Sequence, residues 1–228
     1  MKTGSCDSLF FPHKFKKLHA RFTILETLST SEFCQVFKIQ CKASSQQFSL
    51  KMIEVKGKSR PFDEPRKFFE IDSLVHCDDG ENVYRDSWVE DGAVLIIMRL
   101  FRGSINRIYP FMSLQEKLSA FCQIARQLAS MHRGGFVHLD VKPQNVLFEY
   151  SRKGLKVFLL DFGHSRGPRD ASTPVRGGDL LTLAPELNYS ETLEEIDLTK
   201  CDTYSLGALF LDMMSSKLNR RSTHESLR

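Results

Sequence analysis

Residues 138–145 have the sequence His138-Leu139-Asp140-Val141-Lys142-Pro143-Gln144-Asn145, and they are the most informative part of the chain. The motifs Asp161-Phe162-Gly163 and Ala184-Pro185-Glu186 follow. Asp140 can accept a hydrogen bond from a substrate hydroxyl, and Lys142 can lie beside a transferring phosphoryl group. Asn145 and Asp161 offer the oxygen ligands that magnesium prefers. The segments together predict phosphoryl transfer with ATP and Mg²⁺, in a protein kinase domain.

The spacing between the two expected metal ligands supports this interpretation. Two apolar runs, residues 146–148 and 157–160, are separated by the turn-forming segment 151–154, which predicts a β-hairpin. Asn145 and Asp161 are equally far from Lys153, so antiparallel pairing brings them together at the open end of the hairpin. Either motif alone is weak evidence. The predicted hairpin between them is the context that gives both motifs weight.

Composition excludes several other classes of protein. With 41% hydrophobic and 26% charged residues, the chain can bury a substantial core and is not a disordered tail. The formal net charge of +4 is too small and scattered to predict nucleic-acid binding. The six cysteines include no Cys-x-x-Cys pair, which fits reduced thiols in the nucleus or cytoplasm. The longest apolar run, residues 93–98, is too short for a transmembrane segment.

Patterning along the chain predicts an α+β, two-lobe, protein kinase-like fold. Strand-like segments lie at residues 22–28, 36–41, 48–55, 83–89 and 94–98, and one helix is expected over 63–76. We expect a flexible basic leader (1–21), a kinase domain (22–216) with a β-rich N-lobe (22–100) and a mainly helical C-lobe (101–216), and a polar tail (217–228). Residues 101–112 are expected to cross between the lobes, where the nucleotide binds.

A capping box predicts the first long helix of the C-lobe. Ser113 and Glu116 have the spacing of this motif, and the helix is expected to end before Gly134. An apolar stripe along it comprises Leu114, Leu118, Phe121, Ala125 and Leu128. This helix should lead directly into the loop at 138–145.

The N-lobe should supply a lysine for the ATP phosphates. Lys51 ends the strand-like Phe48-Ser49-Leu50-Lys51, where kinases have Val-Ala-Ile-Lys. Glu70 is its expected partner, with Glu64 and Asp72 as alternatives. Met98 is expected at the back of the adenine pocket, and the predicted hinge is Arg99, Leu100 and Phe101.

From about Phe22 to Leu211 the chain resembles the Wee/Myt family of cell-cycle inhibitory kinases. The resembling segments are residues 31–38, 87–91, 136–143 and 161–164, and Gly178-Asp179 before Ala184. Most Ser/Thr kinases have Gly-Thr where this chain has Gly-Asp, and Asp179 is expected to pair with Lys142. The resemblance implies phosphorylation of a cyclin-dependent kinase on tyrosine, or on threonine and tyrosine, which holds back mitotic entry.

Leu139 stands where many kinases have an arginine that grips a phosphorylated activation loop. An apolar side chain cannot pair with phosphate, so we expect loop phosphorylation not to be the activating switch. The hydroxyl residues in the loop are Ser165, Ser172, Thr173 and Thr182.

Two departures from the family pattern leave other functions open. In the phosphate-covering loop, between Leu28 and Val36, the three glycine positions hold Ser29, Ser31 and Cys34, so weaker nucleotide binding is expected. This departure favours a non-catalytic, kinase-like binding module as one alternative. An ordinary Ser/Thr kinase is a second alternative, because Lys142 is the usual Ser/Thr-class residue.

The second departure is at the C-terminal end. Residues 202–207 resemble the start of the central C-lobe helix, and 208–214 are apolar almost all round. We expect a truncated C-lobe without the helices that should cover this one, including the helix that supplies an arginine to Glu186. We therefore expect self-association through the uncovered helix.

Overall fold

The computed structural model describes residues 15–31, 34–54, 82–152, 154–167, 181–189 and 196–215. These residues divide into two compact units, unit 1 up to Leu100 and unit 2 from Phe101 onward. Unit 1 is a β-sheet with one short helix, and unit 2 is mainly helical, so the predicted α+β class is confirmed. Within the described ranges, we find no helix with the length and apolar character needed to span a bilayer.

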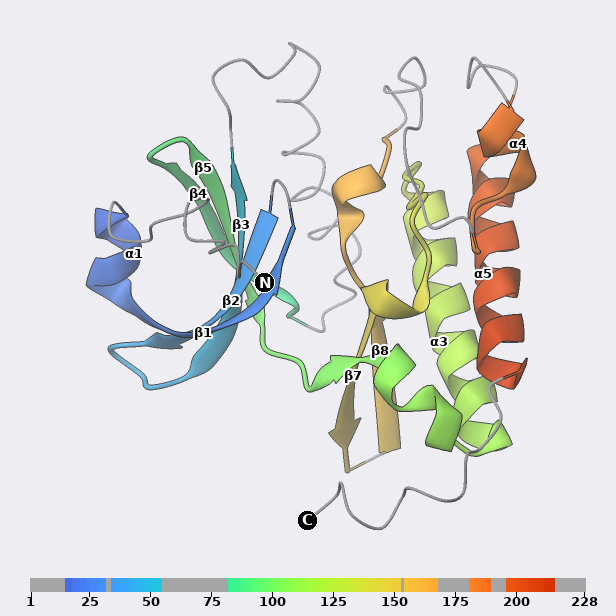
Figure 1. Cartoon of the computed structure of the whole chain (residues 1–228), viewed down its shortest axis with the longest axis horizontal. Helices are drawn as coiled ribbons and strands as arrows, with labels where there is room; N and C mark the ends of the chain where they lie inside the picture. Colours follow the sequence, from blue (N-terminus) through green and yellow to red (C-terminus); the bar gives the residue numbers. More distant parts are fainter. Residues whose placement is uncertain are drawn as a thin grey trace, which may run out of the picture. The chain divides into compact units, whose positions relative to one another are not determined.

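Unit 1 is built on a five-stranded antiparallel sheet with the order β1-β2-β3-β5-β4 (Figure 1). The strands are β1 Phe22–Thr30, β2 Cys34–Cys41, β3 Gln47–Glu54, β4 Tyr84–Glu90 and β5 Ala93–Arg99. All five predicted strands are present, with ends displaced by at most two residues. β5 is buried on both faces, which explains its continuous apolar run.

The two faces of this sheet have different roles. Leu50 and Met52 of β3 are fully buried in a core that also contains Ile97 of β5. Lys51 alternates to the opposite face, because successive side chains of a strand point to opposite sides. Its cross-strand partner is Ile96, and Ser49 is paired with Met98.

A short helix, α1 (Lys16–Arg21), covers the core face of the sheet. Phe15 and Leu18 are buried there, and the backbone N–H groups of Lys17 and Leu18 donate to the Glu90 carboxylate, the first at 2.6 Å. The expectation of a flexible leader is therefore wrong for residues 15–21, whose apolar side chains anchor the helix to the sheet. The rest of that leader, the helix expected over 63–76 with Glu70, and the tail 217–228 lie outside the described residues.

Unit 2 contains the predicted hairpin, formed by β7 (Val146–Ser151) and β8 (Gly154–Leu159). A short strand, β6 (Gly103–Ser104), pairs with β7. The hairpin closes at the pair Ser151↔Gly154, so its centre falls between positions 152 and 153. The predicted centre was Lys153. The observed pairing of β7 with β8 is therefore shifted by one residue from the predicted register.

The helix after Ser113 is confirmed as α3 (Leu114–Arg133), which ends before Gly134 as expected. Its capping box is complete: the Glu116 N–H donates to Ser113 Oγ at 3.2 Å, and the Ser113 N–H donates to Glu116 Oε2 at 2.8 Å. Two of the otherwise unpaired N–H groups at the helix start are thereby satisfied.

The predicted apolar stripe of α3 does not coincide with its buried face. Leu114 and Leu118 are 57% and 45% exposed, and of the stripe only Leu128 is fully buried. The buried positions are Lys117, Ala120, Ile124, Leu128 and Met131. This face is set by packing against β8 and the following helix, which the sequence pattern of α3 alone does not contain.

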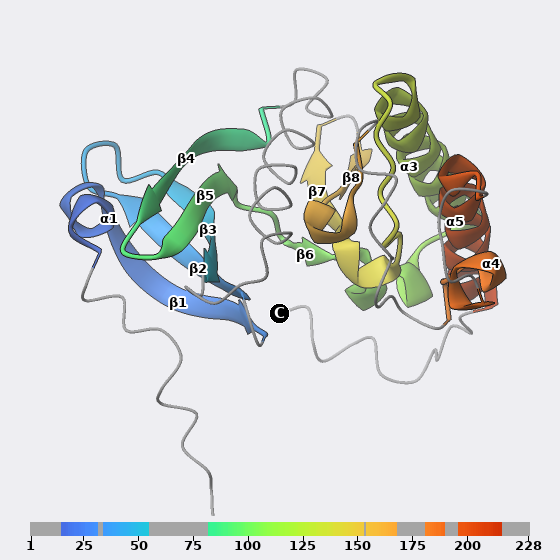
Figure 2. The ribbon, with the colours of Figure 1, turned by 90° about the horizontal axis from the view of Figure 1, so that it is seen from above.

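That following helix, α5 (Leu198–Ser215), lies beside α3 (Figure 2). The rings of Phe121 and Phe210 are 4.6 Å apart, and Leu206, Leu209 and Met213 belong to the core of unit 2. Residues 101–112, expected as a crossing segment, contribute Ile105 and Met112 to the same core.

Candidate active site

The centre of the site is the carboxylate of Asp140, which is 5% exposed. Lys142 Nζ lies 3.0 Å from Oδ1 and 2.7 Å from Oδ2 of Asp140. Asn145 Nδ2 donates to Oδ2 at 2.7 Å and to the Asp140 carbonyl at 2.9 Å. The lysine charge and the amide thus fix the carboxylate, while Oδ1 keeps lone pairs for a substrate hydroxyl.

A buried carboxylate on α5 holds the loop that carries Asp140. Asp202 is fully buried and accepts hydrogen bonds from the backbone N–H of His138 at 2.8 Å and of Leu139 at 2.7 Å. His132 Nε2 is 2.8 Å from the same carboxylate. Leu139 has a left-handed backbone (φ 63°), a strained conformation that these bonds stabilise. This role of Asp202 was not predicted from the sequence, although an Asp in an otherwise apolar helix is a recognisable signal.

His138 connects this loop to the Asp161 motif. Its ring is 5.2 Å from the Phe162 ring, and its Nε2 is 3.3 Å from the Leu160 carbonyl. The Asp140 N–H donates to Nδ1, so the proton of a neutral ring is on Nε2. Burial lowers the pKa of His138, although the charges of Asp202, Asp140 and Asp161 oppose the shift. Asp140 and Asp161 therefore both lie close to this ring.

The two expected metal ligands meet at the open end of the hairpin. The Leu160 N–H donates to the Asn145 carbonyl at 2.9 Å, and Asp161 is the next residue. Because of the register shift, Asn145 is opposite Leu160 and not opposite Asp161. Asp161 has a left-handed backbone (φ 68°) and is followed by a 3₁₀ turn, Phe162–His164. A Cβ added at Gly163 would lie 3.4 Å from Asp161 Oδ1, so glycine leaves room for the carboxylate.

The donor set fits magnesium. The amide nitrogen of Asn145 is used by Asp140, which leaves Oδ1 as a ligand oxygen, and Asp161 adds a carboxylate. Among the described residues there is no group of three or more His, Cys, Asp or Glu side chains that could form a metal cage. Mg²⁺ binds through one or two carboxylates together with phosphate oxygens and water, so one carboxylate and one amide oxygen can suffice as protein ligands.

In unit 1, Lys51 lies on β3 and is 8% exposed. It shares its face of the sheet with its cross-strand partners Val36 and Ile96. Met98 is on the same face, because its partner is Ser49, whereas Ile97 points into the core. Met98 and Lys51 thus share one face of the sheet, and the place of Met98 at the back of an adenine pocket stays a prediction.

At the expected hinge, Ser49 Oγ donates to the Arg99 carbonyl at 3.0 Å. Unit 1 ends at Leu100. Phe101 belongs to unit 2, where its ring is 4.9 Å from Phe158. Each unit thus contains part of the predicted set: Lys51 and Met98 lie in unit 1, and Asp140, Lys142, Asn145 and Asp161 lie in unit 2.

The phosphate-covering loop connects β1 to β2. Its residues 32 and 33 lie outside the described ranges. Ser29 remains in the ladder, paired with Val36. The N–H and Oγ of Ser31 both donate to the Cys34 carbonyl, at 2.8 and 3.0 Å. None of the described loop residues has a positive φ, so glycine is not required for the backbone there. In this arrangement the Ser31 hydroxyl proton points to Cys34 and not to a phosphate.

Ala184-Pro185-Glu186 leads into a short helix, α4 (Pro185–Tyr189). Glu186 was expected to lack an arginine partner, and in the described part of the chain its neighbour is a thiol: Cys201 Sγ donates to Glu186 Oε1 at 3.5 Å. Burial, followed by the Glu186 charge, raises the pKa of Cys201 to about 12.

Leu139 is buried beside Ala184 and Leu187, and Ser165 and Thr182 are also buried. Neither hydroxyl is therefore presented on the surface for phosphorylation. Asp179, Ser172 and Thr173 lie outside the described residues, so the expected pairing of Asp179 with Lys142 stays a prediction.

Comparison with known proteins gives one family. A family model described as a protein kinase domain matches residues 22–227. MAP kinase-interacting serine/threonine-protein kinase 1 of Xenopus tropicalis is 30% identical over 222 residues, covering 90% of this chain and 52% of that protein. Wee1-like protein kinase of Arabidopsis thaliana is 29% identical over 216 residues, with 90% and 41% covered. Ribosomal protein S6 kinase 2 beta of Xenopus laevis is 26% identical over 208 residues, with 85% and 30% covered. The chain thus spans about half or less of the length of these relatives.

Proposed function

Because the chain belongs to the protein kinase family, we propose that it transfers the γ-phosphoryl group of ATP to a hydroxyl group of a protein substrate. The observation that carries this proposal is the Asp140 carboxylate, fixed by Lys142 and Asn145 on a loop that Asp202 holds. Phosphoryl transfer requires positioning and charge neutralisation more than covalent chemistry.

Each residue of unit 2 has a defined task in this proposal. Asp140 accepts the hydrogen bond of the substrate hydroxyl and orients its oxygen. Lys142 neutralises charge beside it. Asn145 Oδ1 and the Asp161 carboxylate would hold Mg²⁺, which, when bound with ATP, neutralises the developing charge on the phosphate oxygens. In unit 1, Lys51 would bind the phosphates, with Glu70 as its partner.

For the substrate, we propose a tyrosine, or threonine and tyrosine, of a cyclin-dependent kinase, with action in the nucleus or cytoplasm and inhibition of mitotic entry. The support is the Wee/Myt-like segments, above all Gly178-Asp179, and the similarity to Wee1-like kinases. Serine/threonine kinases are equally similar, and the bond of Lys142 Nζ to Asp140 suits that class too. An ordinary Ser/Thr kinase is therefore the second candidate.

A non-catalytic binding module is the third candidate. It is favoured by the phosphate-covering loop, because the Ser31 hydroxyl is bonded to Cys34 and no glycine lets the backbone approach a phosphate.

A thermal-shift titration separates an enzyme from a binding module. We expect ATP to raise the melting temperature when Mg²⁺ is present, and Asp161→Asn to abolish the Mg²⁺-dependent part. Asp91→Asn, an exposed carboxylate in the β4–β5 turn, is the matched control and should keep the full shift. No shift at saturating nucleotide would contradict the proposal.

A further inference from the structure

Unit 1 contains a cavity of about 290 Å³ that the proposed phosphoryl transfer does not use. It lies on the α1 side of the sheet, because Phe48 and Ile97 line it and belong to the core that α1 covers. Lys51 is on the other face of the same strand. The cavity is therefore separate from the predicted phosphate-binding residues of this unit.

The polar wall of the cavity carries one guanidinium group more than it has carboxylates. Arg21 Nη1 is 2.7 Å from Asp86 Oδ2, so these two charges are paired. Arg85 also lines the cavity, and within the described part of the chain its guanidinium makes no ion pair or hydrogen bond. The surplus charge of the wall is thus a single positive charge, and it lies on a residue that has all five N–H donors available.

The floor of the cavity is apolar and includes Phe22, Phe48 and Ile97. The Phe22 and Phe48 rings meet edge to face, 6.3 Å apart at 87°. The guanidinium of Arg21 lies over the rings of Phe22 and Trp88, 5.2 and 5.3 Å from their centroids. This apolar environment suits a small aromatic or branched side chain.

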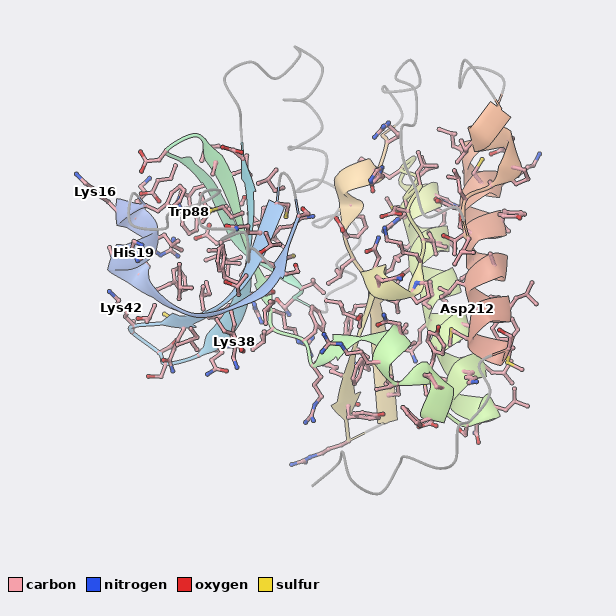
Figure 3. All side chains as sticks on the ribbon, viewed as in Figure 1. Lys16, His19, Lys38, Lys42, Trp88 and Asp212 are labelled. Atoms are coloured by element: carbon pink, nitrogen blue, oxygen red, sulfur yellow. The ribbon has the colours of Figure 1, made fainter. Side chains whose placement is uncertain are left out.

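Lys42 follows the cavity-lining Cys41 directly in the chain. Figure 3 shows Lys16, His19 and Lys42 along one edge of unit 1. Lys42 Nζ donates to the His19 carbonyl at 2.5 Å, and the Lys42 N–H donates to the Arg21 carbonyl at 2.9 Å. These bonds fasten the β2–β3 turn to the end of α1, so the cavity-lining Arg21 and Cys41 are held in place before any ligand arrives.

We propose that this cavity binds an acidic peptide segment of a partner protein, with a carboxylate on Arg85 and an adjoining aromatic or branched side chain on the Phe22–Phe48 floor. A guanidinium binds a carboxylate through two parallel hydrogen bonds, and a single surplus charge matches a monoanion. The second charge of a dianionic phosphate would find no further unpaired cation among the lining residues, because the Arg21 charge is paired with Asp86. Lys42, next to Cys41 in the chain, adds a positive charge near the cavity that attracts further acidic residues of the same segment.

Cys41 supplies an internal reporter, because it lines the cavity and its thiol is free. Hydrogen bonds from Ser44, backbone hydrogen bonds at Ser44 and Ala43, and the Arg21 charge lower the pKa of Cys41. A lower pKa gives more thiolate, which is the reactive form. A segment seated in the cavity should therefore slow the alkylation of Cys41 by iodoacetamide.

The test measures binding of a capped Asp-Glu-Phe-Asp-Asp peptide to the full chain by calorimetry, with the alkylation rate of Cys41 followed by peptide mass mapping. We expect saturable binding and slower Cys41 alkylation, with no change at the exposed Cys122. Arg85→Glu should weaken binding about tenfold or more, since a charge-assisted hydrogen-bonded pair is lost. The matched control Arg126→Glu reverses an exposed arginine on α3 and should leave the affinity unchanged.

Three further probes decide between ligand classes. Replacing Phe by Ala in the peptide should weaken binding, and phenyl phosphate and a short single-stranded RNA should bind more weakly than the peptide. The proposal is overturned if the peptide does not bind, or if Arg85→Glu and Arg126→Glu change its affinity equally. It is also overturned if phenyl phosphate or the RNA slows Cys41 alkylation more than the peptide does.

Discussion

Asp202 is the single residue on which the geometry of the site depends most. Its carboxylate accepts bonds from two backbone N–H groups of the 138–139 segment and contacts His132. Asp202→Ala leaves these buried donors unsatisfied, and each such group costs about 1–3 kcal/mol. We expect a loss of at least about 3 kcal/mol in the free energy of unfolding by urea denaturation.

Asp212→Ala is the control for this prediction, because it removes the same side chain from the same helix. Asp212 accepts one exposed hydrogen bond, from Tyr109 Oη at 2.7 Å, so its removal should have a small effect. Equal losses for the two variants would show that Asp202 has no special role.

Cys201 gives a prediction about reactivity and pH. Burial and the Glu186 charge raise its pKa to about 12 from the usual 9.0, so the folded protein keeps this thiol protonated. A raised pKa contributes stability below pH 9, and this contribution is lost as the pH rises from about 9 to about 12. At pH 8.5, iodoacetamide should label Cys201 at least about a hundredfold more slowly than the exposed Cys122. Similar rates in the folded protein would contradict the buried placement.

At the scale of the elements, the contact between α3 and α5 includes a buried lysine. Lys117 is 6% exposed and its Nζ donates to the Met213 carbonyl at 2.5 Å, in the last turn of α5. Lys117→Met keeps the aliphatic stem and removes the donor, so the last turn of α5 should fray. Hydrogen exchange should become faster over residues 209–215 and stay unchanged over 198–205.

A lysine at the other end of α5 provides the comparison. Lys200 has a 79% exposed side chain and pairs with Asp197 at 3.4 Å, so Lys200→Met should change exchange little. Unchanged exchange in Lys117→Met would show that the bond to Met213 does not hold the helix end.

Local signals predicted most elements well. The five strands, the hairpin between Asn145 and Asp161, and the capping box at Ser113 all rest on residues close together in the sequence, and all are present. The buried face of α3 could not be predicted, because partners far away in the chain decide it. The hairpin register was wrong by one residue, since the turn composition of residues 151–154 does not specify which pair closes it.

The site shows the same division between local and distant information. Asp140, Lys142 and Asn145 lie within one short loop, and their motif predicted a cluster that the structure contains. Asp202 was missed because it contacts this loop from α5, about sixty positions later. The helix at 15–21 was not predicted, because the many basic residues of this segment suggested an exposed leader. Its two apolar residues Phe15 and Leu18 are nevertheless buried.

At the scale of the whole molecule, α5 carries apolar side chains on its exposed side. Leu211 is 69% exposed and Met214 42% exposed. We propose that the chain self-associates through this side of the helix. Sedimentation velocity should show a mass that rises with concentration, and Leu211→Glu should remove this rise. Leu25 on β1 is 43% exposed, and Leu25→Glu is the control, which should leave the concentration-dependent rise in mass unchanged. A monomer at all concentrations would contradict the proposal.

The most direct measurement is transfer of radiolabelled γ-phosphate from ATP to a cyclin-dependent kinase and to a generic peptide, by the wild type and by Asp140→Asn. We expect Mg²⁺-dependent labelling by the wild type and a loss of about a hundredfold or more in the variant, because the oriented hydroxyl acceptor is removed. Asp91→Asn should keep the wild-type rate. Equal labelling by the wild type and Asp140→Asn, or none by the wild type at saturating ATP and Mg²⁺, would contradict phosphoryl transfer at this site.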